Sequence, residues 1–303
     1  MVDITLKKNT LRKATAQAIV RVSSKDTIVA IKNGTVPKGD VFEMSRAAGL
    51  LGVKKTAEIL PDCHPLPIEF TGFEFEINDR EITIRCTIKT IYKTGVEVEA
   101  MHGASIVALN MYDMLKPIDN GVEIHAIKLL SKKGGKSDVY DVQSHLTAAV
   151  IVCSDSISAG QKKDAAGKAI IDVLKKWKVE TSHYQVIPDE ISIIQQTLEK
   201  QKTSGNSLII FTGGTGLSPR DQTPEAIRPL LDKTIPGMEE TIRSFGQNRT
   251  PYAMLSRSVV GMIENRLVLA LPGSTKGAVE SMHALFPAAL HLFDIVKGAQ
   301  HHS

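Results

Sequence analysis

The spacing of apolar residues changes along this 303-residue chain, and that change constrains the possible folds more than any other feature. In residues 14–22 and 81–91 (EITIRCTIKTI) small or apolar residues occupy every second position. This alternation is typical of strands that bury one face and leave the other in water, as in antiparallel sheets. Residues 146–153 and 207–211 are instead apolar almost without interruption, which is typical of parallel strands buried on both faces. The two halves of the chain therefore predict two domains of different fold classes.

The first half predicts an α+β domain. Two helical stretches are expected to end before Pro61 and Pro117, because proline cannot continue a helix. A change of phase around Gly72 suggests a β-bulge in the second strand. The order strand, helix, strand, strand, helix, strand is that of the ferredoxin-like unit, an antiparallel sheet covered by helices. The expected strands are 14–22, 68–77, 81–91 and 122–130, and the expected helices are 41–60 and 97–115.

The second half predicts an α/β domain with three layers and a mostly parallel sheet. Its continuous apolar strands alternate with helices, which places helices on both faces of the sheet. A polar stretch without an apolar period, residues 132–145, is expected to be the linker between the halves. We therefore expect domains at residues 1–140 and 146–303. The expected strands are 146–153, 179–187 and 207–211, and the expected helices are 165–177 and 191–202.

The overall composition favours an enzyme that handles small anionic molecules. A formal charge of +4 is low for this length, and the basic residues are dispersed, which argues against a nucleic-acid-binding protein. No charged and apolar leader begins the sequence, and no apolar run approaches the length of a membrane span. We therefore expect a cytoplasmic protein that binds neither membrane nor nucleic acid.

The three cysteines argue against a disulfide framework or a structural zinc site. They are odd in number, far apart and without a C-x-x-C pair. Cys86 and Cys153 lie inside apolar strand patterns and are expected to be core thiols. Cys63 precedes His64, but on a strand these neighbours would point to opposite faces. A thiolate and imidazolium pair is therefore not expected.

The stretch LIIFTGGTGLSPRDQT, residues 208–223, ends a buried strand in a glycine-rich loop. Glycines lack a Cβ atom, so the backbone N–H groups of such a loop can approach a phosphate closely. We expect Thr223 and Pro224 to be the N-cap and first residue of a helix whose N-terminus helps to hold an anion. No lysine follows Gly216 and the next glycine of G-x-G-x-x-G is missing, so the loop matches neither common phosphate motif.

Two aspartates follow strand ends in this half: Asp221 after the glycine loop, and Asp189 in the motif IPDE. Ligands bind open parallel sheets at the carboxyl ends of the strands. Two carboxylates there can share a magnesium ion with the phosphates of a nucleotide, as in nucleotidyl transfer. Asp189 and Asp221 are therefore predicted as catalytic residues and metal ligands. The alternative is that both aspartates cap helices.

Charged side chains also gather at the ends of the expected elements of the first half, namely Lys38, His64, Asp113 and Lys116. Asp113 and Lys116 are three residues apart on one expected helix, so they share a face and shift each other's pKa. A lysine beside a carboxylate is a plausible acid/base group for a phosphorylated substrate. The alternatives are an ordinary solvated ion pair and, for His64, a hydrogen-bonded buried histidine.

The motifs TGGTGLSPRDQTPEA, SDS at Ser154, IPDE at Ile187, LSR at Leu255 and LPGS at Leu271 together resemble the molybdopterin adenylyltransferase family over residues 147–299. The resemblance implies adenylation of molybdopterin by ATP and magnesium with release of pyrophosphate, with Asp189 and Asp221 at the essential acidic positions. Gln222 replaces the usual apolar residue of RD-x-TP, a change expected to leave the chemistry intact. The substrate-binding residues it implies are Thr212, Gly213, Gly214, Thr215, Gly216, Ser256, Arg257, Pro272, Gly273 and Ser274.

Residues 2–138 resemble the cyclic pyranopterin monophosphate synthase family in order and spacing, from VDIT at Val2 to GGKS at Gly134. The resemblance implies conversion of a cyclised dihydro-GTP into cyclic pyranopterin monophosphate with loss of pyrophosphate and without a cofactor. Asp113, Lys38, Lys116 and His64 match its catalytic positions. The substrate-binding residues it implies are Arg12, Asp62, Cys63, His64, Glu97, Val98, Glu99 and Lys132.

Three positions depart from the pattern of that family. Asp62 replaces an apolar residue and would place a negative charge near a triphosphate. His102 and Gly103 interrupt a helix face of small residues, and Asp138 follows Gly-Lys-Ser in place of glycine.

Together the two resemblances predict a bifunctional enzyme of molybdenum cofactor synthesis. Both families form oligomers, the synthase with sites shared between subunits, so a homo-oligomer, trimer or hexamer, is expected. The alternative is that the second domain only binds molybdopterin or forms an oligomerisation scaffold, without efficient adenylation.

Overall fold

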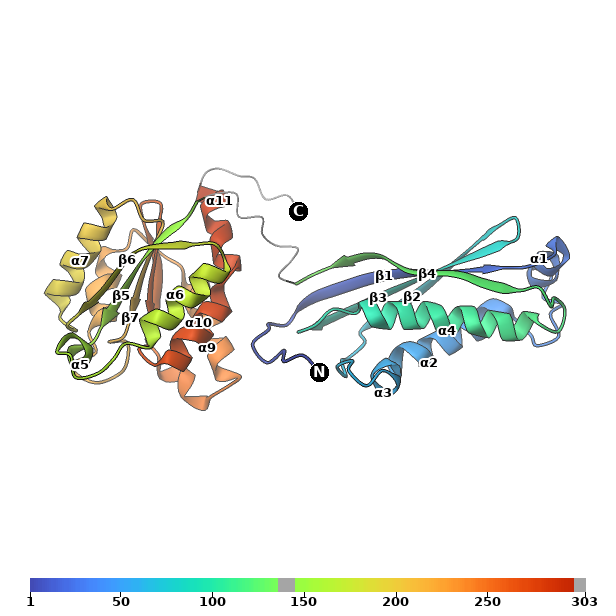
Figure 1. The fold of residues 1–303 in the computed structure, drawn as a ribbon, viewed down its shortest axis with the longest axis horizontal. Helices are drawn as coiled ribbons and strands as arrows, with labels where there is room; N and C mark the ends of the chain where they lie inside the picture. Colours follow the sequence, from blue (N-terminus) through green and yellow to red (C-terminus); the bar gives the residue numbers. More distant parts are fainter. Residues whose placement is uncertain (136–144, 297–303) are drawn as a thin grey trace. The chain divides into compact units, whose positions relative to one another are not determined.

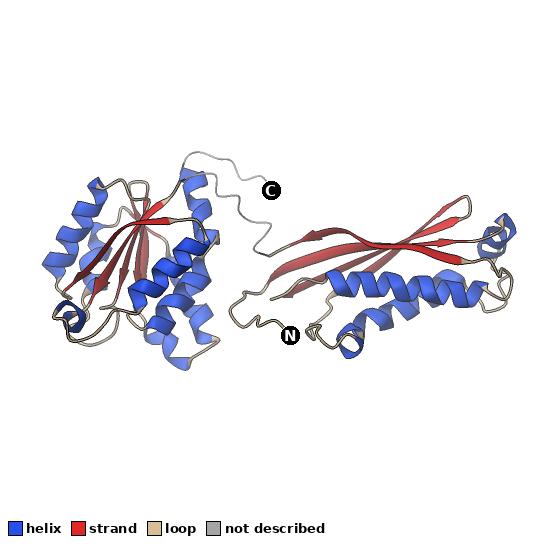
Figure 2. Ribbon diagram, viewed as in Figure 1, coloured by secondary structure: helices blue, strands red, loops and turns tan. Residues whose placement is uncertain are grey.

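The computed structural model describes residues 1–135 and 145–296, and the chain divides into two compact units, residues 1–139 and 140–303 (Figure 1). Helices and strands occur in both units (Figure 2). Each unit has its own hydrophobic core and is described by itself. The expected boundaries at 140 and 146 fall at the edge of the described residues and stay predictions.

The N-terminal unit is a four-stranded antiparallel sheet with helices on one face (Figure 1). Its strands lie in the order β2-β3-β1-β4, and the long helices α2 and α4 pack against each other. Its strands and helices are β1 (Thr10–Arg21), α1 (Lys25–Lys32), α2 (Val41–Lys54), α3 (Thr56–Ile59), β2 (Phe70–Asn78), β3 (Glu81–Tyr92), α4 (Glu97–Leu115) and β4 (Glu123–Lys133).

Small residues allow helices and sheet to approach closely in this unit. The buried face of β1 consists of alanines and valine, and α4 turns Ala100, Ala104 and Ala108 toward it. A Cβ atom on Gly103 would lie 2.5 Å from Val53 Cγ2 and 2.9 Å from Cys86 Sγ. Gly103 is therefore required by packing, and its neighbour His102 hydrogen bonds the Thr56 hydroxyl at 3.0 Å. Of the departures noted above, Asp138 lies outside the described residues.

The structure corrects four expectations for the N-terminal unit. Helix α1 was not expected, and the expected helix 41–60 is two helices, because the backbone of Lys55, with φ −101° and ψ 7°, departs from helical geometry. No bulge lies at Gly72, since β2 and β3 pair without a shift; the irregularities lie between β1 and β4. Strand β4 continues to Lys133, so the first two residues of the expected linker are strand.

The C-terminal unit is a three-layer α/β fold. Its sheet has the order β6-β5-β7-β10-β9-β8. Strands β6, β5, β7 and β10 are parallel, and β9 runs antiparallel to both of its neighbours, β10 and β8. Its strands are β5 (Thr147–Cys153), β6 (Glu180–Ile187), β7 (Leu208–Thr212), β8 (Lys233–Thr234), β9 (Val259–Ile263) and β10 (Arg266–Leu271). Its helices are α5 (Asp155–Ser158), α6 (Ala166–Lys176), α7 (Ile191–Thr203), α8 (Thr223–Ile227), α9 (Pro236–Gln247), α10 (Thr275–Leu285) and α11 (Leu292–Val296).

Alternate side chains of the central strands lie in two separate hydrophobic cores, one on each face of the sheet. Ala148 and Val150 of β5 face the core beneath α6, α9 and α10, whereas Ala149 and Ile151 face the core beneath α7 and α8. This confirms the interpretation of the continuous apolar runs as strands buried on both faces. Among the described residues, no helix has the length and apolar character that a membrane crossing requires.

Candidate active sites

The C-terminal end of α4 carries a carboxylate held between two lysines. Asp113 Oδ2 lies 2.6 Å from Lys38 Nζ, and its Oδ1 lies 2.7 Å from Lys116 Nζ. Hydrogen bonds from Lys116 and Lys38 lower the pKa of Asp113 to about 2, so this carboxylate is ionised at neutral pH. The structure thus confirms that Asp113 and Lys116 share a helix face, and it adds Lys38 from the loop before α2.

A second group of the predicted residues lies at the N-terminal end of α4. Lys132 Nζ of β4 is 3.2 Å from Glu97 Oε1, and the Cys63 thiol donates to Glu99 Oε1 at 3.2 Å. Burial, together with Glu99, raises the pKa of Cys63 to about 11, and burial also raises the pKa of Glu99. Cys63 is therefore a protonated donor and not a nucleophile. It and His64 lie in the loop between α3 and β2.

Arg12, Asp62 and Val98 complete the predicted set in this unit. The Arg12 guanidinium donates to the carbonyls of Tyr92 at 3.2 Å and Lys93 at 3.3 Å, so its position beside the end of β3 is fixed. Asp62 is exposed and forms an ion pair with the Met1 amino group, and Val98 is exposed on α4.

These two groups lie far apart within a single chain. Glu97 begins α4 and Asp113 lies in its last turn. A helix rises 1.5 Å per residue, so the intervening 16 positions separate the two groups by about 24 Å. The two groups, which we call part-sites, therefore lie at opposite ends of one helix.

The predicted nucleotide site of the C-terminal unit is a cleft of about 490 Å³ at the carboxyl ends of β5, β6, β7 and β10. It brings together the glycine loop and both predicted aspartates. The predicted residues that line it are Asp189, Thr212, Gly213, Gly214, Asp221 and Gly273. Two more of the predicted residues, Pro272 and Ser274, lie beside this cleft. Pro272 O accepts from the Thr212 hydroxyl at 2.8 Å, and Ser274 is the N-cap of α10.

Glycine is required where this loop meets its neighbours. Gly213 and Gly214 have φ values of +104° and +60°. A Cβ atom on Gly213 would lie 2.1 Å from Cys153 O, and one on Gly214 would lie 2.3 Å from both Asp189 Oδ2 and Thr223 Oγ1. A Cβ atom on Gly216 would lie 2.8 Å from Asp221 Oδ2. The loop therefore places its backbone directly against the two carboxylates.

Neither aspartate caps the helix that follows it. The residues at the N-caps of α7 and α8 are Glu190 and Gln222, and neither helix has a side-chain cap bond. Asp221 Oδ2 instead accepts from Ser218 N at 2.9 Å. Asp189 is buried, and this burial, reinforced by the nearby carboxylates, raises its pKa to about 6. Neither aspartate is thus the N-cap of the helix that follows it, although Asp189 accepts from the backbone of Gln222 and from the Thr223 hydroxyl at the start of α8. Thr223 begins α8 one position after the true N-cap.

The sequence prediction missed a third carboxylate in this cleft. Asp155 Oδ1 accepts from Asp189 N at 3.1 Å, and its Oδ2 accepts from Arg220 Nη2 at 2.6 Å. Hydrogen bonds from Arg220 hold the pKa of Asp155 below its ordinary value. The signal was present, because Asp155 follows β5 as Asp189 follows β6. Lys162 and Lys163 also line the cleft.

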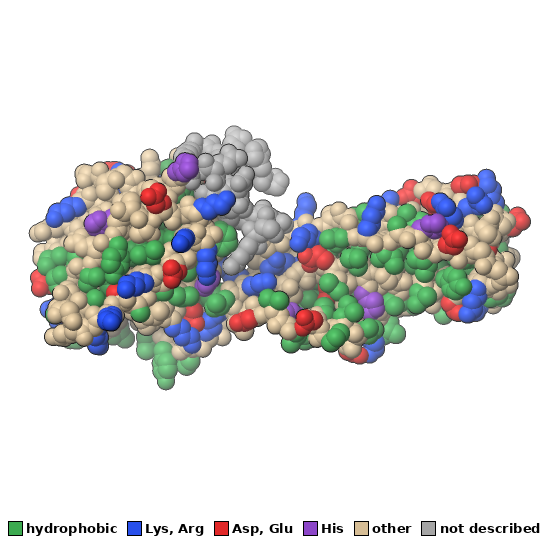
Figure 3. All heavy atoms as spheres, in the orientation of Figure 1, with side chains coloured by type: hydrophobic (Ala, Val, Ile, Leu, Met, Phe, Trp, Pro, Cys, Tyr) green, Lys and Arg blue, Asp and Glu red, His purple; other side chains and the backbone are tan. Residues whose placement is uncertain are grey.

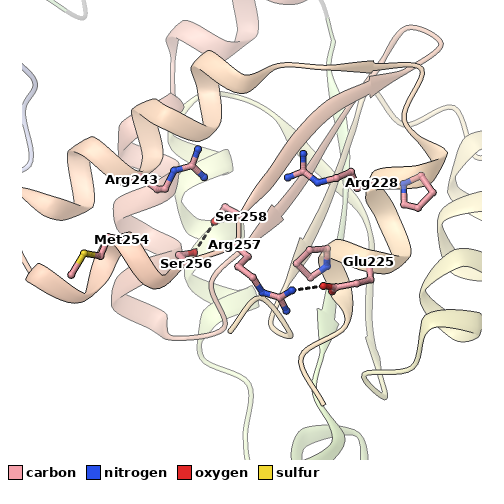
Figure 4. Close-up of a pocket in the computed structure, with 9 residues that line it drawn as sticks. Glu225, Arg228, Arg243, Met254, Ser256, Arg257 and Ser258 are labelled. Carbon is pink, nitrogen blue, oxygen red and sulfur yellow. Dashed lines mark hydrogen bonds and ion pairs between the residues drawn. The ribbon is translucent and has the colours of Figure 1, made fainter. Parts of the chain in front are cut away.

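Ser256 and Arg257 lie in a second cleft of about 700 Å³ (Figure 4). The Arg257 guanidinium donates to Gly216 O at 2.8 Å and to Asp221 O at 2.6 Å, and it pairs with Glu225. Arg257 N–H also donates to Thr215 O at 3.2 Å. Arg257 therefore joins the glycine loop to the wall of the second cleft.

The donor set of the first cleft fits magnesium. Carboxylate oxygens of Asp189 and Asp221 face the backbone of the same loop. Within the part of the chain that the structure describes, no three or more His, Cys, Asp or Glu side chains form a metal cage. Magnesium prefers one or two carboxylates plus substrate phosphates to such a cage. Asp189 and Asp221 are the residues that would hold it.

Comparison with known proteins covers both units. The MoaC family model matches residues 1–135, and the model described as probable molybdopterin binding domain matches residues 149–291. A molybdenum cofactor biosynthesis bifunctional protein of Chlorobaculum tepidum is 38% identical over 99% of this chain and 96% of its own length. One from Synechococcus elongatus is 36% identical over 99% of this chain and 98% of its own. The cyclic pyranopterin monophosphate synthase of Geotalea uraniireducens is 46% identical over 46% of this chain and 88% of its own.

The two units, each with a charged site of its own, define an enzyme with two separate sites on one chain. The full-length similarity identifies it further. The chain belongs to the family of bifunctional molybdenum cofactor biosynthesis proteins.

Proposed function

We propose that the C-terminal unit transfers the adenylyl group of ATP to molybdopterin. The observation that supports this proposal is a hydrogen bond between the walls of the two clefts. Asp221, which follows the glycine loop, lines the first cleft, and its backbone carbonyl accepts from Arg257, which lines the second. Molybdopterin joins a pterin to a phosphate, so a pterin in the second cleft can present its phosphate to the first. A phosphate oxygen then attacks the α-phosphorus of ATP, and the bond to pyrophosphate breaks.

The residues of the first cleft divide this work. Backbone N–H groups of the glycine loop hold phosphate oxygens. Asp189 and Asp221 would hold magnesium, which when bound would neutralise phosphate charge. Lys162 and Lys163 line the same cleft and offer cationic partners for the leaving pyrophosphate. The charge that a phosphate-loop lysine supplies in Walker proteins is here supplied by residues outside the glycine loop.

Asp221→Ala tests this proposal against the scaffold alternative. The full chain is incubated with ATP, magnesium and molybdopterin, and adenylated product is measured by chromatography. We expect wild type to form product and Asp221→Ala to lose magnesium-dependent activity while still binding molybdopterin. If wild type binds molybdopterin but forms no adenylated product, the unit is a scaffold.

We propose that the N-terminal unit converts a cyclised dihydro-GTP into cyclic pyranopterin monophosphate and pyrophosphate. The carrying observation is Asp113 between Lys38 and Lys116, an ionised carboxylate that holds two ammonium groups ready for proton transfer and phosphate contact. Its strand order, β2-β3-β1-β4, supports assignment as a ferredoxin-like fold.

We further propose that two copies of the chain complete each synthase site. The part-sites at the ends of α4 lie about 24 Å apart in one chain, further than a nucleotide-sized substrate can bridge closely. A two-fold axis brings the Asp113 end of one copy to the Glu97 end of another. The expected trimer or hexamer follows if such pairs assemble further.

A further inference from the structure

The second cleft of the C-terminal unit contains two arginines that the sequence motifs did not indicate. Arg228 follows α8 and Arg243 lies on α9, and both line the cleft with Met254, Ser256 and Ser258. Figure 4 shows their guanidinium groups on opposite sides of Ser258, pointing toward each other. Two cations that face each other across a small space repel unless a negative charge lies between them.

A buried carboxylate supplies that charge. Glu239 lies on α9 one turn before Arg243 and is only 6% exposed. Its Oε1 accepts from Val260 N at 3.1 Å and lies 3.4 Å from Arg228 Nη2, while its Oε2 lies 3.8 Å from Arg243 Nη2. Burial of a carboxylate is unfavourable unless partners surround it. Each oxygen of Glu239 therefore positions one of the two arginines.

The arginines differ in how many donors remain for a ligand. The guanidinium of Arg257 already donates to two loop carbonyls and forms an ion pair with Glu225. Arg228 and Arg243 keep 51% and 33% of their side chains exposed, and a guanidinium has five N–H donors. Against these three arginines stand Glu225 and Glu239, so the cleft has a surplus of one positive charge. One surplus positive charge is too small to neutralise a polyphosphate, and the planar guanidinium donors also match the acceptors of a heterocycle.

We propose that Arg228 and Arg243, positioned by Glu239, select the pterin ring of molybdopterin; this rests on the proposed function of the unit. A pterin is planar and has acceptors, a carbonyl oxygen and unprotonated ring nitrogens, beside amino and ring N–H donors. Planar guanidinium groups match the acceptors, and the hydroxyls of Ser256 and Ser258, 3.0 Å apart, can accept from the donors. The cleft volume lies within the range of small-molecule sites.

Quenching of pterin fluorescence tests the arginines without ATP or magnesium. The full chain is titrated into 6-hydroxymethylpterin, and Kd is compared for wild type, Arg228→Ala, Arg243→Ala and Arg266→Ala. We expect about a 10-fold or greater increase in Kd for the first two variants, the value of a lost hydrogen-bond pair. Arg266→Ala removes an Arg–Glu pair at the far end of β10 and should leave Kd unchanged. Arg228→Lys and Arg243→Lys, which keep the charge, should still lose affinity if planar donors matter.

Glu239 is tested as a positioning residue. Glu239→Gln keeps an acceptor for Val260 N–H but no longer holds two guanidinium groups. We expect its KM for molybdopterin to rise about 5-fold or more while its KM for ATP stays unchanged, because only the second cleft loses its arrangement. A merely structural role would change both constants or lower Tm without a selective effect.

The outcomes separate this inference from the proposed function. Unchanged pterin affinity in both alanine variants, or no quenching by wild type, overturns the inference even if adenylated product forms. Pterin binding that depends on the arginines, without adenylated product, overturns the adenylation proposal and leaves the inference standing.

Discussion

Asp113 shows how a single exposed residue can organise a site. It lies in the last turn of α4, and its two oxygens bind lysines that are 75 and three positions away in the sequence. Its pKa of about 2 keeps it ionised at any pH above about 4. The sequence predicts the Lys116 contact from helix spacing, whereas the Lys38 contact depends on how the loop before α2 folds back.

Asp113→Asn should abolish pterin formation and leave the fold intact. Asparagine keeps the shape of the side chain but removes the charge that holds both ammonium groups. We expect kcat of the synthase reaction to fall about 100-fold or more, with an unchanged circular dichroism spectrum. Asp79→Asn is the matched control, because Asp79 also forms an exposed ion pair with a lysine, Lys25. Near-normal turnover of Asp113→Asn would refute the assigned role.

Individual residues also show where the sequence is informative and where it is not. The strand-end positions of Asp189 and Asp221 can be predicted from apolar runs followed by polar residues. The role of Arg228 could not, because its contact with Glu239 joins the segment after α8 to α9, whereas Glu239 and Arg243 are an i,i+4 pair within α9. Likewise, the packing of Gly103 against Val53 depends on the approach of two helices. Periodicity within an element is local, whereas such contacts depend on the fold.

At the scale of elements, the glycine loop works because backbone occupies the space that a side chain would need. Gly214→Ala would place a methyl group 2.3 Å from Asp189 Oδ2. We expect adenylation to fall about 100-fold or more, since the loop and the carboxylate must move apart. Product formation from ATP and molybdopterin measures this.

Gly205→Ala is the control for that variant. Gly205 also has a positive φ, +79°, but a Cβ atom there meets nothing within 4 Å. Both variants should lose about 1 kcal/mol of stability from the left-handed backbone, and Gly214→Ala should lose more because its methyl group lies 2.3 Å from Asp189 Oδ2 and Thr223 Oγ1. Only Gly214→Ala should lose activity; equal activities would show that the close approach is unimportant.

Asp119 links the segment after α4 to the start of α1 through hydrogen bonds. After α4, this nearly buried carboxylate accepts from Ser23 N, from the Ser23 and Thr27 hydroxyls, and from Gly121 N. Burial opposes its ionisation, but these hydrogen bonds outweigh burial and lower the pKa to about 2. A carboxylate with a lowered folded-state pKa stabilises the fold above its unfolded pKa and loses that effect as the pH falls.

Asp119→Asn should therefore destabilise the protein in a pH-dependent way. At pH 7 we expect a loss of about 2 kcal/mol, which shrinks as the pH falls from about 4 to about 2. Urea unfolding followed by circular dichroism at pH 7 and pH 3 measures the difference. Glu58→Gln, which loses an exposed ion pair with Lys55, should show no comparable effect. A loss for Asp119→Asn that stays constant with pH would contradict the argument.

At the scale of the whole molecule, the two units have separate cores and separate candidate sites. Lysine and arginine side chains are dispersed over the face shown in Figure 3, as their dispersal along the sequence predicts. The fold classes of both units were predictable, because alternating and continuous apolar strands differ in one-sided and two-sided burial. The proposed pairing of copies does not follow from periodicity, which says nothing about the surfaces through which copies would meet.

Mixed oligomers test the shared synthase site. Asp113→Asn and Glu99→Gln should each be inactive alone, but co-refolded equal mixtures should regain about a quarter of wild-type activity. Half of random pairs are mixed, and one of the two sites in each mixed pair is intact. Mixing Asp113→Asn with Lys38→Ala, which lie at the same end of α4, should restore nothing. Equal results for both mixtures would place the site within one chain.

The residues in the middle of α4 set the distance and the rotation between the part-sites at its two ends, although they belong to neither. One residue inserted there would shift one end by 1.5 Å and rotate it by about 100° relative to the other. Substitutions along the exposed side of the helix leave that relation unchanged, whereas any change in length alters it. If two copies complete each synthase site as proposed, the number of residues in α4 sets the distance and the rotation between the groups that each copy contributes.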